Sequence, residues 1–390
     1  MRAKTILAAM TVLAMTANAA TYTYEDPDTH VVWTYVINSD TTADGSTAIT
    51  LGGGTAAKTA IAKETKFDAA NILWKFTDNN INYTVTRINA HAFNGCSGLT
   101  GTLTIPDTVI DLGRGQAFRG TGLTHVASVG SAEALAWGCF YSCTSLTGVF
   151  RLGNQVSMPD YQFGYCTSLS AIFAPGPDTG TTSINVKDLC QNASVLKVVY
   201  VGPNVEMANS ISADTQKALR NVTGCKVFVP TSGGWLNFPA ANGGNNTDII
   251  YYGADTNLNL VVDEDAKTIT ATPTDEAALL KMLEVAPTLK EVLGFDTVIS
   301  INSDIDATVE ITEEMLTNVK VEVPTWYLTF AVKTQAQLNR VLAVTTGPIV
   351  ADITGATQEI TPPVGRRVAI LAPGGAIFNY HKRGLIIQFR

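Results

Sequence analysis

Apolar residues recur along the first half of the chain at a nearly constant interval. Five segments place a large apolar residue a few positions ahead of a leucine, and both markers return every 22 to 27 residues. Two markers that keep one period indicate an internal repeat. The large apolar residues are Phe93, Phe118, Phe140, Phe163 and Leu189, and the leucines are Leu99, Leu123, Leu146, Leu169 and Leu196.

Each leucine opens a short alternating run, such as Leu103 and Ile105 in the first segment or Val198 and Tyr200 in the fifth. A period of two predicts a β-strand. One unit of this length cannot cover its own apolar face, so successive units must stack. The pattern therefore predicts stacked coils whose strands pair with one another and whose Phe and Leu side chains fill the interior. Prolines that cannot donate to a ladder end several of these runs: Pro106, Pro175, Pro203 and Pro230.

Three cysteines occupy the same place in their coils, three residues before the leucine: Cys96, Cys143 and Cys166. Thr121 stands close to this position in the second coil. Because equivalent positions of a stack face the same way, we favour a buried packing role, in which Cys acts as a small hydrophobe. A disulfide or a reactive thiol is the alternative. The six cysteines form no C-x-x-C pair, which argues against a zinc site.

The first coil resembles the BspA-type leucine-rich repeat of secreted and surface proteins. The resemblance covers about residues 30–240 and weakens in the fifth coil, where Leu189 replaces Phe and Asn192 stands near the Cys position. It implies a non-enzymatic solenoid that serves as an adhesion or protein-binding module. The residues that match the repeat are Ile88, Ala92, Phe93, Gly95, Cys96, Leu99, Thr100, Ile105 and Pro106.

The segments on either side of the repeats resemble the ends of such arrays. Trp33–Tyr35 and Ala48–Leu51 resemble a β-hairpin cap, and Tyr83–Ile88 leads into the first coil. Val227–Pro230, followed by Trp235, resembles a closing coil.

Beyond the Gly-rich stretch that begins at Gly243, the repeat markers disappear. Thr274–Val285 resembles Lys333–Val344 at an offset of 59 residues, and both have apolar residues at helical spacing. We expect two short amphipathic helices within a β-rich α+β region, and the duplication suggests two related units. The strands expected there are Val298–Ile301, Ile349–Ile353, Arg367–Leu371 and Leu385–Phe389.

The predicted fold is a leucine-rich-repeat solenoid of short parallel strands and irregular coils, with an N-terminal β cap and a separate β-rich α+β C-terminal region. We expect a leader, a β-hairpin cap, the repeats, a linker and the C-terminal region over residues 1–20, 21–86, 87–240, 241–255 and 256–390.

The N-terminus has the pattern of a secretory signal peptide. Arg2 and Lys4 precede the apolar run Ile6–Met15, and Ala17–Ala19 provides a small-x-small cleavage site. The run is shorter than the ~20 residues that span a bilayer. We therefore expect cleavage after residue 19 or 20, and a mature protein that is secreted or held at the cell surface with no membrane span.

The charge balance excludes some partners. The chain has 26 Lys and Arg against 34 Asp and Glu, a net charge of −8, and loss of Arg2 and Lys4 with the leader changes this to −10. An acidic chain without a basic patch should avoid nucleic acid and anionic membranes.

Chemical motifs are missing from the sequence. It has no G-x-S-x-G, H-E-x-x-H or P-loop signature. Asp263–Asp265 and the pair Asp304 and Asp306 lack the Gly and distal Glu of a complete calcium loop. We therefore expect that this protein is not an enzyme and that it has no catalytic residue, no bound metal and no cofactor.

The function expected from these patterns is binding or adhesion outside the cell, with an extracellular protein or glycan held on the strand face of the coils. A structural, self-assembling envelope or matrix component is the alternative, and the oligomeric state is open. The candidate contact residues are Arg119, His125, Tyr141, Arg151, Tyr161 and Tyr165.

Overall fold

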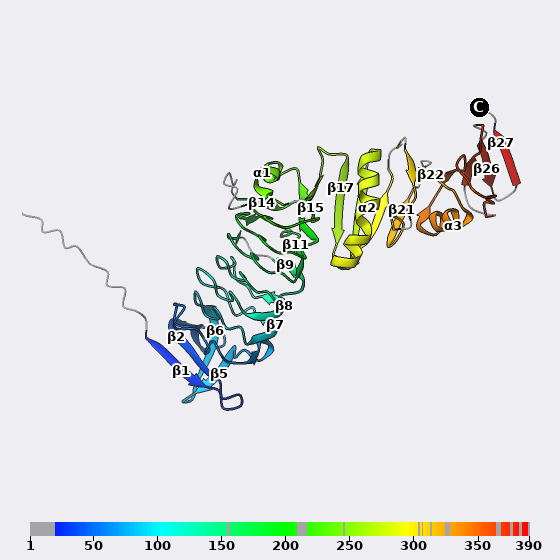
Figure 1. Ribbon diagram of the computed structural model, residues 1–390. Helices are drawn as coiled ribbons and strands as arrows, with labels where there is room; N and C mark the ends of the chain where they lie inside the picture. The colour runs from blue at the N-terminus through cyan, green and yellow to red at the C-terminus, as the bar shows by residue number, and fades with distance from the viewer. Residues whose placement is uncertain are drawn as a thin grey trace, which may run out of the picture.

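The chain folds into one elongated, strand-rich molecule, whose elements follow one another along a curved path in the computed structural model (Figure 1). The leader expected over residues 1–20 lies outside the described residues, apart from Ala20, and so does the pair Asp304 and Asp306. The structure describes residues 20–153, 157–208, 217–244, 246–302, 305, 307–312, 314–323, 328–363, 368–374, 377–381 and 384–388.

The N-terminal end is a five-stranded sheet in the order β1-β2-β3-β6-β5. β2 and β3 form the antiparallel hairpin expected around Trp33 and Ala48, and β6 pairs in parallel with β3. Trp33, Tyr35 and Val85 are buried beneath it. The strands are β1 (Thr21–Glu25), β2 (Val32–Thr41), β3 (Thr47–Leu51), β5 (Lys75–Asp78) and β6 (Ile81–Ile88).

The repeats form coils whose leucines open parallel strands, as the sequence predicts. One sheet has the order β4-β7-β8, and a second the order β16-β15-β13-β11-β9. A third, smaller sheet on another side of the coils has the order β10-β12-β14. The bounds are β4 (Phe67–Asp68), β7 (Leu99–Ile105), β8 (Gly122–Val129), β9 (Gly148–Arg151), β10 (Ser157–Met158), β11 (Leu169–Ala174), β12 (Thr182–Ile184), β13 (Val198–Val201), β14 (Val205–Met207), β15 (Lys226–Pro230) and β16 (Asp248–Tyr252).

The repeated phenylalanines form a stacked column inside the coils. The ring centroids of Phe93 and Phe118 lie 5.1 Å apart, those of Phe118 and Phe140 5.7 Å, and those of Phe140 and Phe163 6.2 Å. Neighbouring rings are within 10° of parallel. Because each ring is fully buried, the column fixes the register of one coil on the next.

Each coil turns at two residues of left-handed backbone, one on either side of the Phe position. In the fifth coil, Asp188 has φ 47° and the Phe163 amide donates to the Leu189 carbonyl. In the first coil, the Phe93 amide donates to Ala117, the residue before Phe118. Cys190, not Leu189, therefore stands at the Phe position. The left-handed residues of the first column are His91, Gln116, Gly138, Tyr161 and Asp188, and those of the second are Gly95, Gly120, Ser142, Tyr165, Asn192 and Asn221.

This register also corrects the place of Asn192. The residue belongs to the second left-handed column, and the buried Ala193 takes the Cys position. Gly or Asn fills most of this column because their left-handed backbone carries little strain.

The repeat sheet extends beyond the expected closing coil. β16 lies inside the segment expected to be a linker, over residues 241–255, and pairs in parallel with β15 over Lys226–Pro230. Trp235 is buried in a short 3-10 turn, η3 (Trp235–Asn237), that leads into the helix α1 (Phe238–Asn242).

The sequence predicts a separate C-terminal region, and this prediction is wrong. The region shares a hydrophobic core with the repeats. Helix α2 (Glu276–Leu293) lies against β9, β11 and β13. The outward-facing Phe173 and Tyr200 are 1% and 3% exposed beneath it, and the ring of Phe295 stacks on Phe173 at 5.3 Å. The strand face of the later coils is therefore covered by the chain itself.

The two helices lie where the duplicated segments predict them. Asp275 caps α2 by accepting from the Ala278 amide, and Thr334 with Gln337 forms a capping box at α3. α2 is longer than expected and continues to Leu293. α3 spans Gln335–Val344.

After α2 the chain alternates between two sheets. Their orders are β17-β18-β19-β21-β23 and β20-β22-β24-β25-β26-β27, with parallel pairing from β18 to β23 and from β20 to β25. This part of the chain is thus a second stack of coils, which the sequence pattern did not predict. Its strands are β17 (Leu258–Asp263), β18 (Thr268–Pro273), β19 (Asp296–Ser300), β20 (Thr308–Glu310), β21 (Val319–Glu322), β22 (Leu328–Ala331), β23 (Thr345–Thr346), β24 (Ile349–Asp352), β25 (Val368–Leu371), β26 (Ile377–His381) and β27 (Gly384–Gln388).

Within the residues that the structure describes, no helix combines the length and hydropathy that crossing a bilayer requires.

Candidate binding surface

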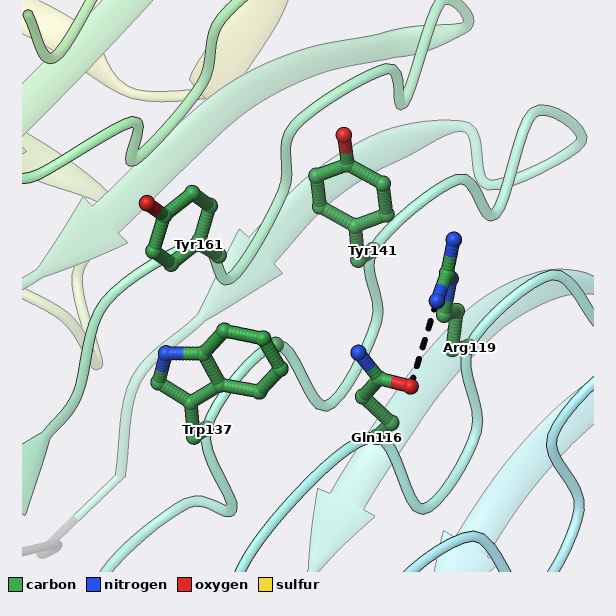
Figure 2. A pocket seen from close by; sticks show the side chains of 6 residues that line it. Gln116, Arg119, Trp137, Tyr141 and Tyr161 are labelled. Atoms are coloured by element: carbon green, nitrogen blue, oxygen red, sulfur yellow. Dashed lines mark hydrogen bonds between the residues drawn. The ribbon is translucent and has the colours of Figure 1, made fainter. Parts of the chain in front are cut away.

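A hollow of about 260 Å³ opens on the turn side of the coils, away from the paired strands (Figure 2). Aromatic rings form most of its wall, and Figure 2 shows the indole and the two phenol rings arranged around it, with one amide and one guanidinium at the other side. The lining residues come from three successive coils: Gln116, Arg119, Trp137, Gly138, Tyr141 and Tyr161.

The floor of the hollow is the first column of left-handed residues. Gln116, Gly138 and Tyr161 have φ of 54°, 57° and 62° and follow one another along the stack. The Gln116 amide donates to the Trp137 carbonyl at 2.6 Å, and the Gly138 amide to Asp160 at 3.0 Å. A Cβ at Gly138 would lie 3.7 to 3.8 Å from the side chains of its neighbours, so the missing side chain leaves the space open.

The aromatic wall extends beyond the hollow. The rings of Trp137 and Tyr161 are 5.1 Å apart at 59°, and Tyr141 contacts Tyr165 edge-on at 5.4 Å. Trp137 is 39% and Tyr165 41% exposed, so these rings are not part of the core. A Cβ at Gly164 would lie 2.8 Å from the Tyr141 ring, so glycine is what allows the ring to lie there.

Cations lie against two of the rings. The Arg119 guanidinium is 5.2 Å from the centroid of Tyr141, and its Nη1 donates to Gln116 Oε1 at 3.2 Å. The Lys187 ammonium is 5.3 Å from the centroid of Tyr161, and its hydrogen bond with that tyrosine raises the pKa of the lysine. Burial raises the pKa of Tyr141, which keeps its hydroxyl protonated. Among the residues that the structure describes, Arg119 is the one charged side chain that lines the hollow.

Further along the same side, the turns become polar. Arg220 donates to Gln191 and lies 3.5 Å from Asp188. Burial raises the pKa of Asp188, against the opposing influence of Arg220. Asn221 Nδ2 donates to Asn192 Oδ1 at 2.8 Å, which joins two coils through their side-chain amides.

Three of the residues predicted from the sequence meet in this hollow. Arg119, Tyr141 and Tyr161 line it, and Tyr165 lies beside Tyr141. They come from turns, so the expectation that the contact residues share the strand face is wrong for these four. Trp137 was missed, although it directly precedes the Gly-Cys-Phe that marks the third coil.

The other two predicted residues lie on strands. His125 is exposed on β8, with its Nε2 3.4 Å from Thr147 Oγ1. Arg151 ends β9, pairs with Glu264 and has its guanidinium 5.0 Å above the ring of Phe173. Arg151 thus ties the repeats to the C-terminal region instead of joining the hollow.

The cysteines occupy the interior. All six are buried and free of disulfides. Cys143 Sγ donates to the Phe118 carbonyl and Cys166 Sγ to Phe140, both at 3.1 Å across coils. Burial raises the pKa of these thiols, so they lack the thiolate that a reactive cysteine needs. The favoured packing role agrees with this arrangement.

In the described parts of the chain, no group of three or more His, Cys, Asp or Glu side chains lies close enough together to hold a metal ion.

Comparison with solved structures gives two distant likenesses. A leucine rich cell surface protein from Faecalibacterium prausnitzii A2-165 is 14% identical, with 61% of this chain and 97% of that chain covered and a TM-score of 0.22. A leucine-rich repeat protein from Bacteroides ovatus ATCC 8483 is 13% identical, with 75% and 98% covered and a TM-score of 0.23. At these TM-scores neither likeness carries weight for the fold or the function.

Comparison with protein families is more specific. No curated protein matches the chain. The model of the BspA type leucine rich repeat region matches in six copies over residues 70–188. This range begins before the first expected coil and ends in the fifth, where the Phe and Cys markers are lost. Residues 70–188 of this chain are therefore a BspA-type leucine-rich repeat region.

Proposed function

We propose that this protein is an exported, non-catalytic leucine-rich-repeat solenoid with an N-terminal β cap, which binds a protein or glycan outside the cell or at its surface. Its binding surface is the aromatic hollow on the turn side of the coils. The observation that carries this proposal is the presence of tyrosine at two left-handed turn positions, Tyr161 and Tyr165, both with φ 62°.

Left-handed backbone strains a bulky residue by about 1–3 kcal/mol. Other coils make the second of these turns with Gly95, Gly120 or Asn192, so the fold does not require an aromatic residue there. Such strain concentrates at functional sites, because selection for stability alone would favour Gly or Asn at a left-handed position. The tyrosines therefore serve the surface that they build.

The composition of this surface favours recognition. Aromatic side chains and Arg are the residues that most often anchor binding partners. Here Trp137, Tyr141 and Arg119 lie together, and Trp137 is 39% exposed although it is one of the most apolar side chains. A stack of coils extends such a surface along its axis, which suits a long partner.

The test is binding of the mature protein to a panel of immobilised extracellular proteins and glycans. We expect Trp137→Ala and Tyr161→Asn to weaken binding at least tenfold, while the melting temperature stays within a few degrees of wild type. Tyr22→Ala, at an exposed tyrosine of β1, is the matched control. Equal binding by the hollow variants and the control would contradict the proposal.

The second candidate function is end-to-end self-assembly, and one observation favours it. β1 and β27 each lie at the edge of their sheet, at opposite ends of the elongated molecule (Figure 1). Open edge strands can pair with another chain. Sedimentation velocity over a hundredfold range of concentration would distinguish a monomer from growing oligomers.

A further inference from the structure

We propose that the ligand of the hollow is a glycan, and that the unit seated there is a sugar carrying a carboxylate. This inference rests on the proposed function, because it assigns the chemical class of the partner to the same surface. The sugar ring packs against Trp137 and Tyr161, and its carboxylate is held by Arg119.

The size of the hollow favours one small ring. Its volume of about 260 Å³ falls below the roughly 300–1,000 Å³ of pockets that enclose a whole drug-sized ligand. A pyranose presents C–H groups on its faces and hydroxyl groups around its edge. The negative face of an aromatic ring attracts groups of partial positive charge such as these C–H bonds. The tilted rings of Trp137 and Tyr161 offer such faces, and Gln116 offers the N–H groups of its side-chain amide for the hydroxyls (Figure 2).

The charge of the hollow favours an anion. Within the described part of the chain, Arg119 is the one charged residue that lines it, and the net charge of the whole chain is −8. A guanidinium has five N–H donors, and one nitrogen of Arg119 is engaged with Gln116. The remaining donors can hold a carboxylate in a bidentate pair. Lys187, beside Tyr161, places a second cation on the other side, where Asp160 and Asp188 lie near it.

The same charges argue against a peptide anchored by Arg or Lys. Cations are attracted to the faces of aromatic rings. Arg119 and Lys187 already lie against Tyr141 and Tyr161, so a further cation would be repelled from these rings.

The surroundings favour a chain of sugars over a single one. Paired strands, and hence neighbouring coils, are about 4.8 Å apart, which is close to the length of one sugar unit in an extended glycan. Beyond the hollow, Gln191, Arg220 and the linked amides of Asn192 and Asn221 continue along the same turns. Each coil thus offers polar groups to one further unit.

The experiment is calorimetric titration of the full mature protein with four probes. Trigalacturonic acid is paired with its methyl ester, and 3′-sialyllactose with its methyl ester, so that each pair differs only in the charge of the carboxyl group. We expect at least one acidic probe to bind at least tenfold more tightly than its neutral partner. Arg119→Gln should remove that preference without changing the affinity for the neutral probe. Trp137→Ala should weaken both.

Arg114→Gln is the matched control, because Arg114 is an exposed arginine that does not line the hollow. Equal affinity for acidic and neutral probes, full acid preference in Arg119→Gln, or no binding of any probe would overturn the inference. If no sugar binds but Trp137→Ala still abolishes binding to a protein of the panel, the proposed function stands and the glycan assignment fails. If Trp137→Ala leaves all panel binding unchanged, the proposed function itself fails.

Discussion

The turns of this protein place side chains of very different chemistry at equivalent backbone positions. Tyr165 occupies a left-handed position that Gly95, Gly120 and Asn192 fill in other coils. The backbone conformation is shared, so what differs is the conformational strain of the residue and the contacts of its side chain.

Replacement of Tyr165 should separate these two contributions. Tyr165→Asn and Tyr165→Ala both remove the ring contact with Tyr141, but only Asn tolerates the left-handed backbone. We expect the Asn variant to exceed the Ala variant by about 1 kcal/mol in free energy of unfolding, measured by chemical denaturation. Equal stability of the two variants would show that this turn is unstrained.

The buried thiols should make the protein sensitive to alkali. Burial raises the pKa of Cys96 to about 11 and that of Cys225 to about 12. Because an unfolded cysteine titrates near 8.5, the unfolded state loses its protons first as the pH rises. Each such thiol then lowers the free energy of unfolding by about 1.4 kcal/mol per pH unit above that value, until the pH reaches its folded pKa.

Chemical denaturation at pH 8, 9 and 10 measures this dependence. Cys96→Ala should reduce the slope above pH 8.5 by about 1.4 kcal/mol per pH unit. A free energy of unfolding that is constant from pH 8 to 10 would contradict the buried, protonated thiols.

Among the elements, the strand β13 shows most clearly what could be predicted from the sequence. Its alternating Val198 and Tyr200 predict a strand, and the structure confirms it. Val199 and Val201, at the alternate positions of the same strand, are also apolar, which is typical of a strand buried on both faces. An apolar pattern on both faces indicates that some element covers the strand. It does not identify α2 as that element, because α2 and β13 are far apart in the chain.

The second stack of coils was missed for a related reason. Phe, Gly and Cys mark the first stack because Phe and Cys fill its buried interior and Gly adopts the left-handed backbone of its turns. The strands β19, β21 and β23 pair with one another in parallel, but their sequences lack these markers. In the hollow, the two half-buried tyrosines, Tyr141 and Tyr161, could be named from the sequence, but only the register of the coils shows that Trp137 lies beside them.

The packing of α2 predicts that the repeats and the C-terminal region unfold together. Phe295 is 3% exposed and stacks on Phe173 of β11. Phe295→Ala should lower the free energy of unfolding by about 3–5 kcal/mol and increase hydrogen exchange in both β11 and β13. Val261→Ala, at an exposed position of β17 in the C-terminal region, is the control that should leave these strands protected. Faster exchange confined to residues after 256 in the Phe295 variant would indicate separate domains.

The whole molecule offers three distinct surfaces to a partner. The turn side carries the aromatic hollow, and the strand face is open at β7 and β8, where Thr102 and His125 are exposed. The two ends carry the edge strands β1 and β27 (Figure 1). Because α2 covers the strand face of the later coils, the turn side is the longer continuous surface along the repeats.

Hydrogen–deuterium exchange of residues 21–390, with and without a partner identified from the binding panel, tests the central claim most directly. If the hollow is the binding surface, the partner should slow exchange in the turns around Gln116, Trp137–Tyr141 and Tyr161–Tyr165, and leave β1, β7 and β27 unchanged. Protection concentrated on β7 and β8, or on the end strands, with no change in these turns would contradict the account.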